Sequence, residues 1–513
     1  MRTVFSLLAS LAVASTAFAA LEQDAVISLP GWSGALPTKH YSGYLQPSGG
    51  KFLHYYLVES TNNPATDPVV FWFNGGPGCS SMLGFFTENG PFAVESAGAN
   101  GGEPKLTLRD TAWNMAGANV VFLEAPVGVG LSYASNPATG YILNDTITAQ
   151  DNLQAVLAFF NGWPEWRDNE FYLTGESYAG VYVPTLALQI VKHNSVAPAA
   201  QRVNLKGIAV GNGCIGNEVG SCAVHNDSSA QHFHLEFYHG MGAVSQALYE
   251  DIQATCQGEY SNPSAACVSL LADMHQQIGP VDVYNFDGPC VSAPPQGGSS
   301  SSDDISAASK WEFGTGTRKW TRGRRQTALE ARISAELLQR VQAQGDGVDS
   351  FTGVKPGPGP LECIGDGEQG PYLDRDDVRA ALHVEPVSKI GHWNSCVEKT
   401  NWFYTTTEAN EPRDVYPTLL KALDRILIYS GQADGCVPFV DSEAWTSGMG
   451  VPVAKGGEWR PWYTSESQVG GYVTYYEGDF TFLTVTAAGH MVPQFQPAKA
   501  FDMFTRFLKG GKY

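Results

Sequence analysis

Six short, mostly apolar segments recur along this chain, and each is followed by a glycine or a polar residue. They span residues 69–73, 119–123, 171–174, 207–210, 426–429 and 482–485. Hydrophobicity that is continuous rather than alternating predicts strands that are covered on both faces. Helical patterns over residues 148–160 and 181–192 lie between several of these segments. The alternation predicts an α/β fold with a mostly parallel central sheet, whose functional site lies at the carboxyl ends of the strands.

The composition agrees with a large folded globular protein. Of the 513 residues, 43% are hydrophobic, 12% are aromatic and only 16% are charged. This apolar content is enough for a large core, and one α/β unit with an insertion can account for the length. The formal net charge of −20 repels phosphate groups and anionic lipid heads. We therefore expect no nucleic-acid partner and no membrane-surface partner.

The recurring apolar strand segments are missing from the middle of the chain. From residue 214 to 370, segments rich in Cys, Gly, Pro and Ser surround one clear helical pattern over residues 327–344. We interpret 214–370 as a cap or lid inserted into an α/β core formed by residues 20–213 and 371–513. Within the cap, residues 291–326 combine prolines, serines and a basic run. A solvated loop is the simpler interpretation, and a processing-protease cleavage site is the alternative.

The amino terminus predicts export. Residues 1–19 begin with a positive charge, continue through an apolar stretch and end at Ala17-Phe18-Ala19, which is typical of a signal peptide. A membrane anchor is the weaker interpretation because the stretch is short and polar residues interrupt it. Nine cysteines and two Asn-x-Ser/Thr glycosylation acceptors, Asn144 and Asn226, fit the same route. The expected destination is secretion or a vacuole or lysosome.

Three polar residues follow predicted strands in the order Ser, Asp, His. Ser177 lies in Gly175-Glu176-Ser177-Tyr178-Ala179-Gly180, where a sharp strand-to-helix turn with small neighbours would expose a nucleophile. Asp434 follows the strand at 426–429, and His490 follows the strand at 482–485. This chain order is that of α/β-hydrolase triads, with His490 as general base and Asp434 as the group that orients it. An ordinary serine in a glycine-flanked turn is the alternative for Ser177 alone.

A glycine-rich turn offers donors for an oxyanion. The segment Asn74-Gly75-Gly76-Pro77-Gly78 follows the first strand and has bare backbone amides. We expect the Gly76 and Tyr178 N–H groups to form the oxyanion hole, because the amide after the nucleophile is the usual second donor. Taken alone, this glycine-rich segment is a tight turn.

These motifs together resemble those of a known family. The segments at residues 74–81, 175–180 and 489–493 are similar to the motif set of the serine carboxypeptidases, and the likeness extends almost from end to end. The chain resembles cathepsin A-like members of that family most. The resemblance implies a serine-type carboxypeptidase that hydrolyses the C-terminal peptide bond of peptides and proteins through an acyl-enzyme, without a metal or an organic cofactor.

The resemblance also implies how a free C-terminus is selected. In the family, residues matching Asn74, Gly75, Glu88 and Glu176 bind the terminal carboxylate of the substrate. Two adjacent carboxyl groups can share a proton and then donate a hydrogen bond to that carboxylate, which predicts activity that is best at acid pH. Without the resemblance, each glutamate would be interpreted as a solvated surface residue.

Further family positions concern the leaving residue and the cysteines. Met491 resembles a family position that lines the pocket for the leaving residue, and with the apolar Leu83 in the oxyanion segment it suggests a hydrophobic leaving side chain, although two core residues are the simpler interpretation. The disulfides implied are Cys79 with Cys396, Cys256 with Cys267, and Cys290 with Cys363, and Cys214 with Cys222 is expected as a local pair. Cys436 is left over and is expected to be an inert buried thiol.

Two other functions remain open on the sequence. An acyltransferase or esterase could use the same nucleophile, although family acyltransferases tend to have Asp where this chain has Glu176. A mainly stabilising role toward other lysosome-type enzymes is the alternative from a different class. A homodimer is expected from the resemblance only. The histidine pair His232 and His234 is interpreted as surface or lid residues rather than as metal ligands.

Overall fold

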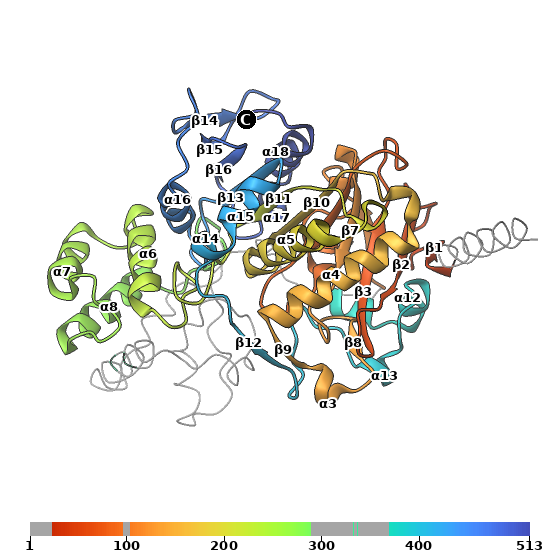
Figure 1. Ribbon diagram of the computed structural model, residues 1–513. Coiled ribbons are helices and arrows are strands. Elements are labelled where there is room, and N and C mark those ends of the chain that lie inside the picture. The colour runs from red at the N-terminus through yellow and green to blue at the C-terminus, as the bar shows by residue number, and fades with distance from the viewer. Residues whose placement is uncertain (1–22, 96–102, 289–331, 333–335, 337–368) are drawn as a thin grey trace, which may run out of the picture.

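A computed structural model describes residues 23–95, 103–288 and 369–513, together with Arg332 and Glu336. Its centre is a twelve-stranded sheet (Figure 1). In spatial order the strands are β1 (Ala25–Val26), β2 (His40–Leu45), β3 (Lys51–Val58), β7 (Asn119–Leu123), β4 (Val69–Phe73), β10 (Phe171–Glu176), β11 (Leu205–Gly211), β13 (Arg425–Gly431), β16 (Phe480–Val485), β15 (Val469–Tyr476) and β14 (Arg460–Tyr463), with β8 (Tyr133–Ala134) beside β3.

The six central strands, from β7 to β16, run parallel to one another. They contain all six apolar segments from which the sheet was predicted, so the α/β prediction is confirmed. The outer strands β1 to β3, β14 and β15 are antiparallel additions that the sequence did not indicate. Their sequences include polar residues such as His40, Ser42 and His54, whose side chains form hydrogen bonds inside the fold.

Strand β4 explains the continuous hydrophobicity. Val69, Phe71 and Phe73 face one apolar cluster, while Val70 and Trp72 face another on the opposite side of the sheet. Because successive side chains point to opposite faces, a strand that is covered on both faces needs apolar residues at every position.

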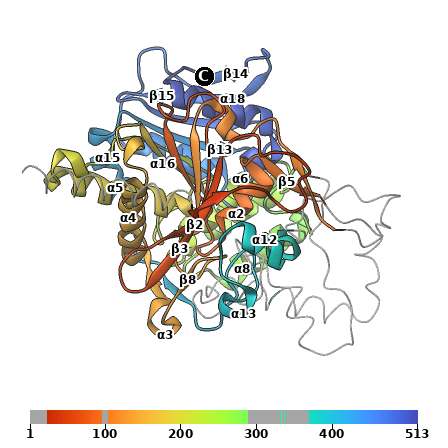
Figure 2. The ribbon, with the colours of Figure 1, turned by 90° about the vertical axis from the view of Figure 1, so that its right-hand side faces the viewer.

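Helices cover both faces of the sheet. The helices α4 (Asp145–Gly162), α5 (Ala179–Val196) and α15 (Tyr416–Ala422) contribute to the first cluster, and α11 (Gln369–Leu373), α12 (Asp376–Ala381) and α18 (Pro497–Lys509) contribute to the second. Figure 2 shows α4 and α5 on the opposite side of the strands from α12. The two predicted helices are confirmed within α4 and α5.

Shorter elements complete the described core. They are α2 (Ser81–Leu83), α3 (Pro137–Gly140), α13 (Val387–Ile390), α14 (Glu411–Asp414), α16 (Phe439–Gly448) and α17 (Val492–Phe495), with single helical turns at Gly84–Glu88, Trp113–Ala116, Pro164–Trp166 and Ala199–Gln201. Two small sheets pair β5 (Phe92–Glu95) with β6 (Lys105–Leu108) and β9 (Ile142–Asn144) with β12 (Phe403–Thr405).

Three helices form a separate lobe beside the sheet: α6 (Asp227–Gly240), α7 (Gln246–Cys256) and α8 (Ala265–Ile278) (Figure 1). They pack around an apolar cluster of their own, which includes Leu235, Ile252 and Leu271. The lobe lies within the predicted cap, where these helices were not foreseen. The residues expected to form the signal peptide (1–19), the processing loop (291–326) and most of the long cap helix (327–344) lie outside the described residues.

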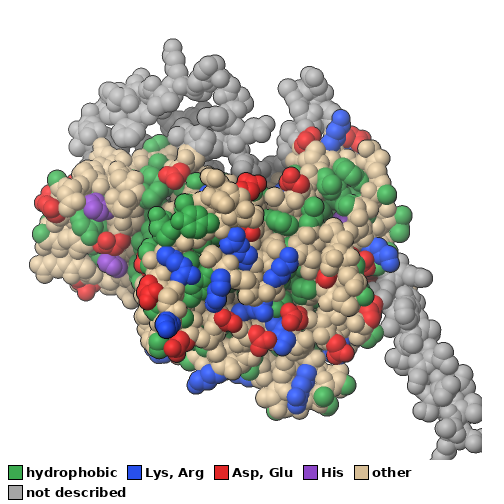
Figure 3. Space-filling model, turned by 90° about the horizontal axis from the view of Figure 1, so that it is seen from above, with side chains coloured by type: hydrophobic (Ala, Val, Ile, Leu, Met, Phe, Trp, Pro, Cys, Tyr) green, Lys and Arg blue, Asp and Glu red, His purple; other side chains and the backbone are tan. Residues whose placement is uncertain are grey.

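Two surface properties bear on the expected partners. Among the helices that the structure describes, none is both long and apolar enough to cross a bilayer. On the face seen in Figure 3, basic and acidic side chains are interspersed. The net negative charge of the chain is therefore not gathered into one patch on that face.

Candidate active site

Ser177 occupies a tight turn between β10 and α5. Its φ of 61° lies in the left-handed region, which non-glycine residues rarely adopt and which costs conformational energy. A Cβ on Gly175 would lie 2.5 Å from the Phe73 carbonyl oxygen and 2.7 Å from the Ala179 Cβ. Only small residues fit on both sides of the serine, which explains why Ala179 can replace the usual glycine.

Asp434 and His490 follow neighbouring parallel strands, β13 and β16, and both side chains are buried. The His490 Nδ1–H donates to Asp434 Oδ2 over 2.6 Å. The Asp434 carboxylate also accepts hydrogen bonds from the Cys436 N–H at 2.8 Å and the Val437 N–H at 3.2 Å. These contacts hold the ring so that Nε2 is left for another partner, and in this structure it has none among the described residues, Ser177 Oγ included.

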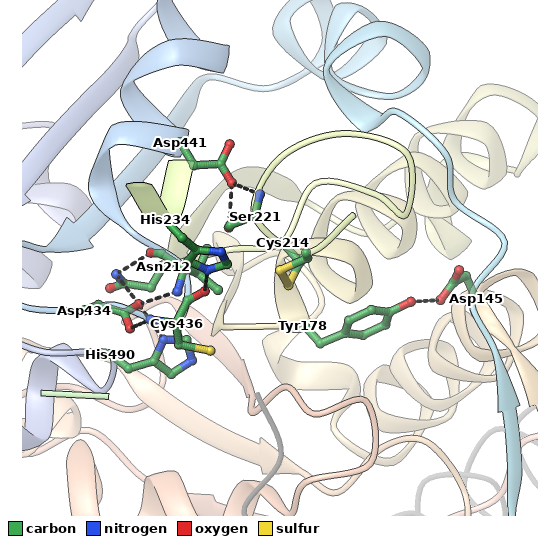
Figure 4. Close-up of a disulfide and its surroundings, with 12 residues drawn as sticks. Asp145, Tyr178, Asn212, Cys214, Ser221, His234, Asp434, Cys436, Asp441 and His490 are labelled. Carbon is green, nitrogen blue, oxygen red and sulfur yellow. Dashed lines mark hydrogen bonds and ion pairs between the residues drawn. A yellow bond between two sulfur atoms is a disulfide. The ribbon is translucent and has the colours of Figure 1, made fainter. Parts of the chain in front are cut away.

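Asn212 also contacts the acid, and the sequence prediction missed it. Its Nδ2 donates to Asp434 Oδ2 over 2.8 Å (Figure 4). The signal was present, because Asn212 comes two residues after the predicted strand at 207–210, at the same sheet edge as the other site residues.

The expected oxyanion segment lies against the nucleophile. A Cβ on Gly75 would lie 2.6 Å from Ser177 Cβ and would collide with the Tyr178 nitrogen. Gly76 has a φ of 111°, which glycine adopts without strain. The Gly75 carbonyl accepts from the Cys79 N–H at 3.0 Å, and Cys79 is bonded to Cys396. The segment is thereby tied to the C-terminal half of the chain.

Asn74, Glu88 and Glu176 come together as predicted, and all three are buried. Asn74 Nδ2 donates to Glu88 Oε1 at 2.9 Å and to Glu176 Oε1 at 3.0 Å. The Asn74 Oδ1 accepts from the Trp72 indole N–H at 2.7 Å, which fixes the orientation of the amide. One oriented amide therefore bridges two carboxyl groups from distant parts of the chain.

The two carboxyl groups affect each other's protonation. Burial raises the pKa of Glu176 well above its usual range, and the neighbouring Glu88 charge raises it further. Burial also raises the pKa of Glu88, while hydrogen bonds from Glu176 and Asn74 work in the opposite direction. Because two adjacent buried charges would repel each other, the pair favours a state in which the two carboxyl groups share one proton. The Arg109 guanidinium, whose pKa burial lowers to about 10, adds a positive charge near Glu88.

Leu83 and Met491 are each partly buried. Leu83 packs against the second apolar cluster, and Met491 caps α17 directly after His490. Neither is a fully buried core residue.

A segment within the predicted cap contacts the loops that carry Asp434 and His490, which the sequence did not indicate. The Phe286 N–H donates to the Ala433 carbonyl at 2.7 Å, and the His490 N–H donates to the Tyr284 carbonyl at 2.7 Å. The Tyr284 ring also packs against the His490 ring, with 5.2 Å between centroids. No motif marks these residues, because their role depends on where the cap lies.

Asp145 is a second residue that the sequence analysis did not single out. Its Oδ1 accepts from the Tyr178 hydroxyl at 2.7 Å (Figure 4). The same oxygen accepts from the Tyr404 hydroxyl at 2.8 Å. The side chain of the residue next to the nucleophile is thereby held at the start of α4.

The structure contains three of the expected disulfides. They are Cys79–Cys396, Cys214–Cys222 and Cys256–Cys267. Cys436 is a buried thiol, and Cys290 and Cys363 lie outside the described residues. The two glycosylation acceptors, Asn144 and Asn226, cap the N-termini of α4 and α6 through their side-chain oxygens. The histidines of the predicted surface pair have different neighbours: His232 lies 4.0 Å from Glu236, and His234 Nε2 lies 3.4 Å from the Cys436 carbonyl.

The parallel sheet, the strained serine turn, and the acid and histidine loops at one sheet edge define an α/β-hydrolase enzyme. A family model described as "Serine carboxypeptidase" matches residues 30–510. The chain belongs to the serine carboxypeptidase family, and it is a serine-type carboxypeptidase.

Curated relatives agree over nearly their whole length. The chain is 36% identical to "Serine carboxypeptidase-like 20" of Arabidopsis thaliana, covering 96% of this chain and 94% of the relative. It is 37% identical to "Serine carboxypeptidase 1" of Hordeum vulgare, with 95% and 93% covered, and 34% identical to the "Lysosomal protective protein" of Mus musculus, with 99% and 98% covered. A solved structure of a prohormone-processing carboxypeptidase from Saccharomyces cerevisiae shares the fold, with a TM-score of 0.63, 19% identity and 96% of each chain covered.

Proposed function

We propose that Ser177, His490 and Asp434 carry out the hydrolysis. His490 Nε2 takes the Ser177 hydroxyl proton as Ser177 Oγ attacks the last peptide carbonyl. The same proton is then given to the leaving amine, and the acyl-enzyme is hydrolysed by water that His490 activates in turn. The 2.6 Å bond from His490 Nδ1 to Asp434 supports these roles, since it holds the ring and balances its positive charge. Nε2 is left to meet Ser177 Oγ, a contact that tightens when substrate binds in many such enzymes.

The oxyanion would be stabilised by the N–H groups of Gly76 and Tyr178. The close approach of Gly75 to Ser177 supports this assignment, because it brings the glycine-rich segment against the start of α5. Donors that are already in place act strongly on the charge that develops in the transition state.

The observation that carries the proposal of substrate selection is the Asn74 amide between Glu88 and Glu176. In our proposal Asn74, Gly75, Glu88 and Glu176 bind the terminal carboxylate of the substrate. A Glu176 carboxyl that keeps its proton can donate to that carboxylate, whereas an ionised one would repel it. Peptide hydrolysis should therefore be best at acid pH. Leu83 and Met491 are proposed to line the pocket for a hydrophobic leaving side chain.

The remaining proposals concern the whole chain. We propose that residues 214–370 form a cap on a core of residues 20–213 and 371–513, as the separate apolar cluster of α6 to α8 supports. Residues 1–19 are proposed as a signal peptide for the secretory pathway, with a secreted or vacuolar/lysosomal destination and glycans on Asn144 and Asn226. A homodimer is proposed from the family resemblance. Light scattering of the purified protein, before and after enzymatic removal of N-glycans, tests the proposed homodimer and the proposed glycans.

The deciding experiment measures release of the C-terminal residue from an N-blocked dipeptide such as N-acyl-Phe-Leu at about pH 4 to 8. Acid-favoured release that Ser177→Ala abolishes is the expected result. Transfer of the acyl group to an alcohol in place of hydrolysis would instead favour the acyltransferase alternative. Release that persists in correctly folded Ser177→Ala would overturn the assignment of the nucleophile.

A further inference from the structure

Asn212 lies at the end of β11, the strand between the one that leads to Ser177 and the one that leads to Asp434. Its side chain is fully buried, and its φ of 40° lies in the left-handed region. The Asn212 N–H donates to the Tyr429 carbonyl over 2.9 Å, which binds its backbone to β13. Asparagine tolerates this conformation better than most residues. The strained backbone turns the Asn212 side chain toward the loop that carries the acid.

Every polar group of the Asn212 side chain is used on that loop. The Oδ1 atom accepts from the Gly431 N–H at 2.9 Å, at the end of β13. The Nδ2 atom donates to Asp434 Oδ2 at 2.8 Å and to the Val437 carbonyl at 3.2 Å. The amide therefore spans the loop from Gly431 to Val437 and holds the carboxyl oxygen that also accepts from His490. An alanine would supply none of these bonds, and an aspartate would place an acceptor against an acceptor.

The same turn is bound to the nucleophile. The Ser177 N–H donates to the Gly211 carbonyl over 3.0 Å, and the Ser177 carbonyl accepts from the Cys214 N–H over 3.0 Å. Residues 211–214 thus hold the Ser177 peptide on one side and, through the Asn212 side chain, the Asp434 carboxyl on the other. Ser177 and Asp434 follow β10 and β13, which are not neighbours in the sheet. The turn after β11, which lies between these two strands, therefore sets the separation of the two residues.

We propose that Asn212 is a positioning residue for the reaction. It fixes the Asp434 carboxyl toward His490 and fixes the acid loop relative to Ser177, without touching the substrate. This inference rests on the proposed triad. It differs from a purely structural role in one respect: its loss should slow the chemical step while substrate binding, which depends on Asn74 and the glutamates, is retained.

The test compares Asn212→Ala with Asn217→Ala. Asn217 is also buried and donates to a main-chain carbonyl, that of Thr406 at 3.1 Å, without contacting the triad. For Asn212→Ala we expect kcat to fall roughly 10- to 100-fold, equally for a peptide and for the corresponding ester, because displacement of catalytic groups by about 1 Å can cost about 100-fold. KM should stay within about threefold, and Asn217→Ala should keep wild-type kcat. A folded Asn212→Ala enzyme with kcat within about twofold of wild type would overturn the proposal.

Asn212→Asp provides a second variant in case alanine prevents folding. It keeps the shape and the acceptor for the Gly431 N–H but adds a negative charge beside Asp434 and His490. That charge stabilises the imidazolium, so the acidic limb of the kcat/KM profile should move to higher pH. A profile that superimposes on that of wild type would count against the proposal. Ser177→Ala serves as the reference. If Ser177→Ala stays active, the proposed triad is wrong. If Ser177→Ala is inactive but the Asn212 variants have the kinetics of wild type, only the role of Asn212 is refuted.

Discussion

The amide nitrogen of Asn74 donates to a carboxyl oxygen of Glu176 over 3.0 Å, in a site where the Glu176 side chain is only 4% exposed. Glu88 accepts from the same nitrogen. Two buried acids therefore share one amide, and in the proposed site for the substrate's terminal carboxylate such a pair could accept that charge only while it carries a proton. Under this proposal, substrate recognition depends on pH.

Replacing Glu176 by Gln should weaken that pH dependence. The raised pKa of Glu176 keeps it protonated in acid, and peptide kcat/KM should fall as the pH rises through that pKa and the pair ionises. A glutamine donates a hydrogen bond at every pH, so the alkaline fall should move to higher pH in Glu176→Gln. An ester without a free carboxylate should show little of this fall in either enzyme. Steady-state kinetics at about pH 4 to 9 give the comparison.

The matched control is Glu443→Gln on α16. Burial raises the pKa of Glu443 too, but this residue is not among the groups that contact Asn74. Its replacement should leave the profile unchanged. An alkaline fall that is identical in wild type and Glu176→Gln would contradict the shared-proton hypothesis.

Gly75→Ala should abolish activity. The added Cβ would lie 2.6 Å from Ser177 Cβ and against the Tyr178 nitrogen, so either the oxyanion segment or the serine turn must move. Displacement of one oxyanion donor alone costs about 100- to 1,000-fold in kcat. Gly162→Ala, at the end of α4 with no atom within 4 Å of the new Cβ, should keep full activity. We would measure the kinetics of both variants and verify their folding by thermal unfolding. A fully active Gly75→Ala enzyme would exclude the close packing of Gly75 against Ser177 and Tyr178.

The disulfides should differ in their contribution to stability. Cys79–Cys396 spans 317 residues and Cys256–Cys267 spans 11. In the chain-entropy account the longer loop restricts the unfolded chain more, by about 3 kcal/mol. The double variant Cys79→Ala/Cys396→Ala should therefore unfold at lower urea concentration than Cys256→Ala/Cys267→Ala. Loss of the first pair should also reduce activity, since the disulfide ties Cys79 to the C-terminal half of the chain and the Cys79 N–H donates to the Gly75 carbonyl. Equal midpoints for the two double variants would argue against a dominant loop-entropy effect.

Asp441 should make the protein less stable at neutral pH than in acid. Burial raises its pKa to about 6, although Ser221 donates to its Oδ2 from both N–H and hydroxyl, at 2.6 and 2.7 Å. A folded-state pKa above the unfolded value means that the folded protein binds the proton more tightly. The contribution of protonated Asp441 to the free energy of unfolding is therefore present below pH 4 and is lost as the pH rises toward 6. The loss amounts to about 3 kcal/mol over this range.

Asp441→Asn removes this titration and keeps an acceptor for Ser221. We expect the free energy of unfolding of the variant, measured with urea between pH 4 and 7, to fall less with pH than that of wild type. The exposed residue Asp424 offers a control, since Asp424→Asn should leave the wild-type slope unchanged. Parallel curves for Asp441→Asn and wild type would show that other groups cause the pH dependence.

Local patterns were sufficient for the central sheet and for many of the site residues. The strands around Phe71 and Ile428 were predictable because burial on both faces demands an unbroken apolar run, and the turn at Ser177 because steric limits demand small neighbours. The glutamates were assigned through the family resemblance, since neither Glu88 nor Glu176 carries a local sign of burial.

The sequence by itself determined the α/β class with its mostly parallel central sheet and the chain order of Ser177, Asp434 and His490. Its motifs also indicated membership of the serine carboxypeptidase family. These follow from periodicity and from short motifs, which act over a few residues. Only the tertiary structure decided that Asn212 would hold Asp434, that Tyr284 would pack on His490, and that one Asn74 amide would join Glu88 to Glu176. Such contacts join residues that are tens to hundreds of positions apart, and the strand order and the packing of the cap bring them together.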